Sequence, residues 1–131
     1  WIIEVAARSI GGLCSRALHF GSAGLLEDLI LRHALGLPVP AIESDRPATG
    51  VMMIPIPVAG VLRQVAGIEA ARALVGIDDV TISIPIGEML VPVPEGKRYL
   101  GFIFASGDTP EAVEAALRVA HDELEFTIKP G

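Results

Sequence analysis

The sequence predicts an α+β protein with a mostly antiparallel sheet and helices packed on one face of that sheet. Short apolar runs with strand-like alternation and stretches with helical spacing follow one another over residues 50–129, in the order β(β)αββαβ. The chain is 51% hydrophobic and only 20% charged, which is typical of a globular domain and not of a disordered one. Its 131 residues are enough for one domain with a substantial core.

The first stretch, residues 1–12, is an apolar run that ends on two glycines. In an extended chain Glu4 and Arg8 project from the same side, because side chains alternate between the two faces of a strand. The pair Gly11-Gly12 then offers backbone N–H groups in a flexible turn. Two interpretations stay open here: an edge-strand ion pair followed by a loop, or a site that holds a metal ion and a phosphate together.

Two helical segments are expected next. Residues 13–20 are long enough for one or two turns, and residues 23–35 carry an apolar stripe at helical spacing. Ser22 is the expected N-cap of the longer helix. Gly36 is the expected residue just past its end, and Pro38 prevents any continuation.

The composition changes over residues 37–49, which contain three prolines and a charged cluster. Such a segment is typical of a linker. The sequence therefore predicts a first segment over residues 1–36, a Pro-rich linker over residues 37–49, and a closing α+β subdomain over residues 50–131.

The closing subdomain, residues 50–131, is expected to supply most of the sheet. Pro55 and Pro57 place its first strand at an edge or a bend, because proline cannot donate a ladder hydrogen bond. The apolar run 98–105 is expected to be central in the sheet. The expected strands are 50–56, 61–65, 80–86, 98–105 and 125–129, with a short helix over 68–74 and a turn over 92–96.

The clearest local signal is a helix start at Thr109-Pro110, with Thr109 as N-cap and Pro110 as first helical residue. Apolar residues follow at the spacing of one buried helix face. These residues are Val113, Ala116, Leu117, Ala120 and Leu124.

The net charge, the single cysteine and the absence of some motifs argue against several kinds of partner and site. A net charge of -6 argues against nucleic acid or an anionic membrane surface as a partner, and no apolar run reaches the length of a membrane span. Cys14 stands alone, which excludes an intrachain disulfide, favours a small buried thiol and is typical of a reducing, cytoplasmic setting. The histidines do not cluster in sequence, and no zinc spacing or P-loop is present.

The opening stretch gains a further meaning when it is combined with the helical segments after it. The motif Glu4-x-x-x-Arg8-x-x-Gly11-Gly12, together with residues 13–16 and 26–36, resembles the C-terminal end of ATP-grasp ligases. The branch it resembles most is that of carboxylate–amine ligases, which is related to L-amino acid ligases and more distantly to biotin carboxylase and carbamoyl-phosphate synthase.

The later stretches 50–67 and 98–124 look like the closing subdomain of the same branch, so the resemblance covers nearly the whole chain. The chain also begins at Trp1, inside a predicted strand, without an initiator Met. We therefore expect a C-terminal fragment of a longer ligase.

The resemblance implies an enzyme that uses ATP and Mg²⁺ to phosphorylate a carboxylate, which an amine then attacks. It implies that Glu4 helps to hold the magnesium ions between the nucleotide phosphates, and that Arg8 contacts the transferred phosphoryl group as the catalytic residue. It also implies that Gly11 and Gly12 let the backbone approach the substrate. Hard carboxylate oxygens and a fixed guanidinium suit these roles.

The sequence departs from the family pattern at one position. Many ATP-grasp enzymes carry an asparagine metal ligand two residues after the glutamate, where this chain has Ala6. The resemblance further implies lysines, an adenine-lining hinge and another metal-binding acid upstream of the residues present. The fragment itself is therefore expected to be catalytically incomplete.

A second function class remains open beside the ligase. Residues 50–129 alone follow the order of a ferredoxin-like module, which is also used for small-molecule sensing or for oligomerisation without catalysis. A homo-oligomer, or a dimer in which residues 1–36 exchange between copies, is compatible with either class.

Overall fold

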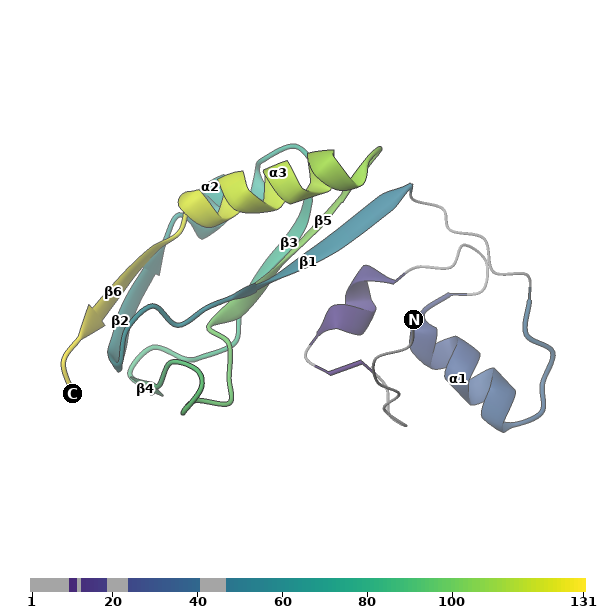
Figure 1. The fold of residues 1–131 in the computed structure, drawn as a ribbon, viewed down its shortest axis with the longest axis horizontal. Helices are drawn as coiled ribbons and strands as arrows, with labels where there is room; N and C mark the ends of the chain where they lie inside the picture. Colours follow the sequence, from purple (N-terminus) through teal and green to yellow (C-terminus); the bar gives the residue numbers. More distant parts are fainter. Residues whose placement is uncertain (1–9, 12, 19–23, 41–46) are drawn as a thin grey trace. The chain divides into compact units, whose positions relative to one another are not determined.

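The computed structural model describes residues 10–11, 13–18, 24–40 and 47–131. The chain divides into two compact units, Trp1–Asp45 and Arg46–Gly131, and each unit is described by itself. The elements are labelled in Figure 1.

The described part of the first unit holds a 3-10 helix, η1 (Cys14–Ala17), and an α-helix, α1 (Leu26–Ala34). The prediction that α1 begins at Ala23 is wrong, because Gly24 has a left-handed backbone (φ +81°) and Leu25 is the N-cap. Instead of a Ser22 cap, the Asp28 side chain folds back and accepts a hydrogen bond from the Leu25 N–H group (3.1 Å).

The end of α1 confirms the predicted role of Gly36. This residue has φ +65°, its N–H group donates to the His33 carbonyl (3.2 Å), and the Leu37 N–H group donates to the Arg32 carbonyl (2.9 Å). These two bonds form a Schellman motif, in which a left-handed residue lets the chain turn back over the last carbonyls.

The described part of the second unit contains six strands and two helices. The strands are β1 (Ala48–Ile54), β2 (Gly60–Ala66), β3 (Ile77–Ile82), β4 (Met89–Leu90), β5 (Gly101–Gly107) and β6 (Glu125–Lys129). The helices are α2 (Ile68–Arg72) and α3 (Pro110–Asp122).

The strands form two three-stranded sheets, β1-β5-β3 and β4-β2-β6, and every pairing is antiparallel. The single sheet expected from sequence is therefore divided. The division falls between β1 and β2, where Pro55 and Pro57 interrupt the extended chain. Because proline has no N–H group to donate, the ladder with β5 ends at Ile54, and after the interruption β2 pairs with β6 instead.

If β1 and β2 are read as two halves of one interrupted strand, the order across both sheets is β6, then β2 and β1, then β5, then β3. The chain contains two β-α-β units, β2-α2-β3 and β5-α3-β6. In this order β2 lies between β6 and β5, and β5 lies between β2 and β3, so the two units interleave. This is the split βαβ plan.

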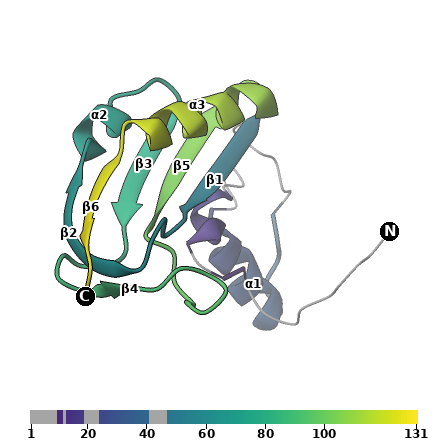
Figure 2. The same cartoon turned by 60° about the vertical axis from the view of Figure 1, so that its left-hand side comes forward.

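Both helices lie on the same side of the strands, as Figure 2 shows, so the predicted α+β class with helices on one face is confirmed. The hydrophobic core fills the space beneath them. Its most deeply buried large side chains are Ile54, Leu62, Val80, Leu90, Leu100 and Ile103. Gly50 lets α3 approach β1 closely, because a Cβ atom there would lie 2.7 Å from Val113 Cγ1.

The predicted start of α3 is confirmed. Thr109 has an extended backbone, its hydroxyl accepts a hydrogen bond from the Ala112 N–H group (3.2 Å), and Pro110 is the first helical residue. Val113, Leu117 and Ala120 are buried in the core, as their spacing predicts.

Some strand limits differ from the prediction. The strand predicted over residues 80–86 runs from Ile77 to Ile82, because only these residues pair with β5. Ile84 is buried beyond the strand end, whereas Ile86 is exposed. The prediction that β5 is central is confirmed, although it begins at Gly101 and not at Arg98. The two-residue strand β4 was not predicted.

Candidate functional site

Most of the predicted metal and phosphate site lies outside the described residues. This applies to Glu4, Arg8 and Gly12, so the shared face of Glu4 and Arg8 stays a prediction. Gly11 is described, and it lies exposed in a bend that leads toward η1. Its predicted role in the close approach of the backbone to a substrate stays a prediction.

The 3-10 helix η1, which follows this bend, is connected to α1 by a side-chain hydrogen bond. The Ser15 side chain of η1 forms a hydrogen bond with the Glu27 carboxylate, and this bond is the main cause of a lowered pKa of Glu27. The Glu27 backbone N–H group lowers the pKa further, because an accepted hydrogen bond stabilises the ionised carboxylate. Neighbouring Cys14 is a half-buried free thiol, which is less buried than expected.

The first turn of α1 is occupied by its own acids. Glu27 and Asp28 lie there, and Asp28 accepts the Leu25 N–H group. Carboxylates at this position interact favourably with the helix dipole and take the place that an anion would otherwise occupy. The start of α1 is therefore not suited to bind a phosphate.

The Ser15 to Glu27 bond gives a prediction about pH. A Ser15→Ala variant is expected to raise the pKa of Glu27 toward its ordinary value, because the largest lowering contribution is removed. Carboxyl carbon NMR during a pH titration measures this change directly. In the wild type, the bond adds stability above the ordinary pKa, and that contribution is lost as pH falls through the lowered value.

Ser106→Ala is the matched control, since the Ser106 hydroxyl is bonded to a different carboxylate, Asp78 (2.9 Å). It is expected to leave the Glu27 titration unchanged. An unchanged Glu27 pKa in Ser15→Ala would contradict the assignment of the bond.

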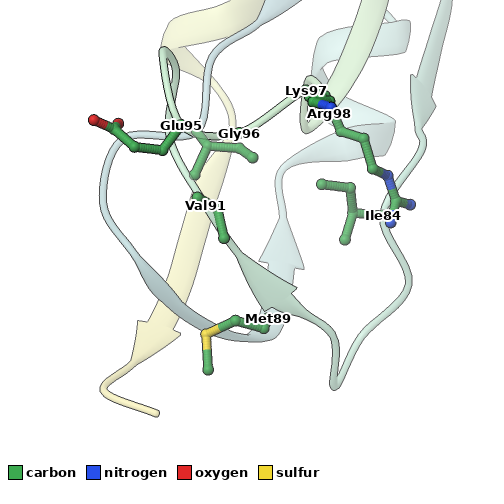
Figure 3. A pocket seen from close by; sticks show the side chains of 8 residues that line it. Ile84, Met89, Val91, Glu95, Gly96, Lys97 and Arg98 are labelled. Atoms are coloured by element: carbon green, nitrogen blue, oxygen red, sulfur yellow. The ribbon is translucent and has the colours of Figure 1, made fainter.

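A second candidate site is a pocket of about 220 Å³ in the second unit. It lies between β4, the loop that leads to β5, and the segment after β3 (Figure 3). Its lining is apolar at the base and charged at the upper edge. The lining residues are Ile56, Ile84, Met89, Val91, Glu95, Gly96, Lys97 and Arg98.

One of the two basic side chains of this pocket is fixed. Arg98 pairs with Glu88 (2.7 Å) and also lies 3.4 Å from the Ser83 carbonyl oxygen. No such ion pair or hydrogen bond holds Lys97 within the part of the chain that the structure describes. Sequence reasoning treated residues 92–96 only as a turn and missed this site. The adjacent cations Lys97 and Arg98 after that turn were the available signal.

A family model described as L-amino acid ligase C-terminal domain 2 matches residues 52–129. The chain belongs to this family. The predicted resemblance to the C-terminal portion of an ATP-grasp ligase is thereby confirmed. No curated protein matches the chain.

Among solved structures, the L-amino acid ligase from Bacillus licheniformis is similar, with a TM-score of 0.64 and 26% sequence identity. The match covers 78% of this chain and 26% of that ligase, so this ligase-family chain spans about a quarter of the length of its solved relative. The second unit holds about two thirds of the chain, so a match of 78% also includes residues of the first unit.

The described part of this ligase-family chain shows neither a cluster of metal ligands nor a membrane-spanning helix. Within the described ranges, His, Cys, Asp and Glu side chains never gather in a group of three or more that could hold a metal ion. None of the helices in those ranges has the length and apolar character that crossing a membrane requires.

Proposed function

We propose that this chain is the C-terminal part of an ATP-dependent ligase that joins a carboxylate to an amine through an acyl phosphate. The observation that carries the proposal is the family match over residues 52–129, which covers most of the second unit. The similarity to a solved L-amino acid ligase supports it, because that match also reaches residues of the first unit. Amino acids are the substrate class that this relative's name indicates.

In this proposal the first segment, residues 1–36, completes the catalytic domain, and residues 50–131 form a closing subdomain. Arg8 contacts the phosphoryl group as it moves to the carboxylate, and a fixed guanidinium stabilises the charge that develops on its oxygens. Gly11 and Gly12 let backbone N–H groups approach the substrate because they have no side chain in the way.

Glu4 is the proposed magnesium ligand, and its hard carboxylate oxygens fit the chemistry of that ion. When bound, magnesium would supply positive charge that offsets the negative charge of the nucleotide phosphates. Ala6 has no donor atom, and the described residues contain no cluster of metal ligands. Mg²⁺ at a nucleotide site is usually held by one or two carboxylates together with the substrate phosphates, and we propose that a second acid comes from the part of the ligase that precedes Glu4.

The isolated chain is accordingly proposed to be inactive, since it spans only 26% of the solved relative. We further propose a cytoplasmic setting, where ATP and amino acids are available. Self-association of the chain, with or without strand exchange, remains a proposal as well.

The test compares the longest open reading frame that contains this chain with the 131-residue chain alone. The full ligase is expected to release ADP and phosphate only when amino acids are supplied, and to form a dipeptide detected by mass spectrometry. Hydroxylamine is expected to trap the acyl phosphate as a hydroxamate. The isolated chain is expected to release no ADP.

Two results would overturn the proposal. Release of AMP and pyrophosphate would indicate an acyl adenylate instead of an acyl phosphate. Absence of any amino-acid-dependent nucleotide turnover in the full-length protein would exclude ligation.

A further inference from the structure

The pocket beside β4 has a preformed apolar base. Ile56 and Ile84 are almost fully buried (8% and 3% exposed), whereas Met89 and Val91 are about half exposed (54% and 42%). Figure 3 shows Ile84 on one side of the pocket and Met89 and Val91 on the other. Exposed apolar walls around a concave space favour a ligand that brings apolar surface of its own.

Hydrogen bonds to the core hold the walls of this pocket. The Gly87 N–H group donates to the Leu62 carbonyl (2.8 Å), and the Leu62 N–H group donates to the Glu88 carbonyl (3.0 Å). On the other side, the Leu100 N–H group donates to the Ile54 carbonyl (2.9 Å). Ile54, Leu62 and Leu100 are fully buried, so the pocket is anchored to the rigid part of the unit.

The loop over the pocket is also closed on itself. The Gly96 N–H group donates to the Pro92 carbonyl (2.8 Å), and a Cβ atom at Gly96 would overlap the Val91 carbonyl oxygen. The loop thus passes so close to Val91, the residue after β4, that only glycine fits at this position. A pocket formed in this way costs little ordering when a ligand binds.

The charges at the edge of the pocket favour an anion. Glu88 already neutralises Arg98 (2.7 Å), and the Glu95 carboxylate points away from Ile84 and Met89 in Figure 3. Lys97 is exposed and has no ion-pair partner among the described residues. Its ammonium group on a flexible stem is therefore available for a ligand that enters the pocket.

We propose that this pocket binds a small carboxylate with a branched aliphatic chain, the size of a free aliphatic amino acid. The volume of about 220 Å³ suits such a ligand, because a cavity of about 150 Å³ already accepts benzene. The aliphatic chain packs between Ile84, Met89 and Ile56, and the carboxylate pairs with Lys97. An α-amino group is not required, since the Glu95 carboxylate lies on the outer side.

This proposal does not depend on the ligase function, and its test uses the 131-residue chain without ATP. The probe is 4-methylpentanoate, added to protein labelled with ¹³C at the methionine methyl groups. The Met89 signal is expected to shift and to saturate in the millimolar range, as a single ion pair and a small apolar contact allow. Met52 and Met53 on β1 are outside the lining and are expected to stay in place.

A ligand of opposite charge and a substitution of the lysine both test the role of Lys97. The corresponding amine, 4-methylpentylamine, is expected not to shift Met89, and L-leucine is expected to bind about as well as 4-methylpentanoate. Lys97→Gln is expected to weaken binding about tenfold, because the carboxylate loses its charged partner. Lys129 is the other lysine of the chain, and Lys129→Gln is expected to leave the affinity unchanged.

Several results would each overturn the proposal. These are no saturable shift of Met89 with 4-methylpentanoate, an equal shift with the amine, or equal affinities of the Lys97→Gln variant and the wild type. An equal loss in Lys97→Gln and Lys129→Gln would show a general effect of net charge and would also overturn it.

Discussion

Replacing Arg8 by alanine in the proposed full-length ligase is expected to lower kcat for dipeptide formation by about a thousandfold. In the proposed role, the Arg8 guanidinium stabilises charge on the transferred phosphoryl group, and loss of one such positioned group typically lowers kcat by about this factor. Because the interaction is strongest in the transition state, KM for the amino acids is expected to change much less than kcat. Steady-state measurement of ADP release and of dipeptide yield checks both quantities.

Arg118→Ala is the matched control. Arg118 lies exposed on α3, where it pairs with Glu114 (2.7 Å), and an exposed pair of this kind contributes little to stability. This variant is expected to keep kcat within about twofold of the wild type. A kcat of Arg8→Ala that equals that of Arg118→Ala would exclude Arg8 from phosphoryl transfer.

Glu4→Gln separates the metal role from the phosphoryl role in the same assay. Loss of one carboxylate charge is expected to raise the Mg²⁺ concentration needed for the half-maximal rate. Arg8→Ala is expected to leave that concentration nearly unchanged. If both variants respond alike to Mg²⁺, the assignment of separate roles to Glu4 and Arg8 is wrong.

Replacing Gly67 by alanine is expected to lower the free energy of unfolding of the second unit by about 3 kcal/mol or more. Gly67 is the N-cap of α2 and has a left-handed backbone (φ +81°, ψ -1°), which alone costs alanine about 1 kcal/mol. A Cβ atom there would also overlap the carbonyl oxygen of Glu123, at the end of α3. Relief of that overlap requires the start of α2 and the end of α3 to separate.

Gly87→Ala tests the cost of the left-handed backbone without the cost of the overlap. Gly87 has a similar left-handed backbone (φ +94°), but a Cβ atom there meets nothing within 4 Å. Urea denaturation followed by circular dichroism is expected to show a loss of about 1 kcal/mol for Gly87→Ala and a clearly larger loss for Gly67→Ala. Equal losses would show that the close approach of α2 and α3 adds nothing.

Several parts of the fold were predictable because their causes lie within a few residues along the chain. The start of α3 rests on Thr109 and Pro110, and the bond that caps it spans three residues. The end of α1 rests on Gly36, whose positive φ is readily adopted by glycine. The central place of β5 was predictable from its continuous apolar run, and the first five residues of this strand are all buried in the structure.

The start of α1 was predicted wrongly although its cause is also local. Ser22 is a good capping residue, and the sequence offers it as the expected start. In the structure Asp28 caps the helix from inside its first turn, next to Gly24. Propensity alone does not decide between a serine before the helix and an acid within it, because each can accept the same N–H groups.

The sequence by itself determined the α+β class and the family resemblance, because composition, periodicity and a spaced motif are properties of the chain. The assignment of Glu4, Arg8, Gly11 and Gly12 to a metal and phosphate site also comes from the sequence alone and stays a prediction. Only the tertiary structure decided that the strands divide into two sheets and that Ile56, Ile84, Met89 and Lys97 surround one pocket. These residues come from segments far apart in the sequence. Their meeting depends on which strands pair and in which register, and many pairings satisfy the same local pattern of apolar residues.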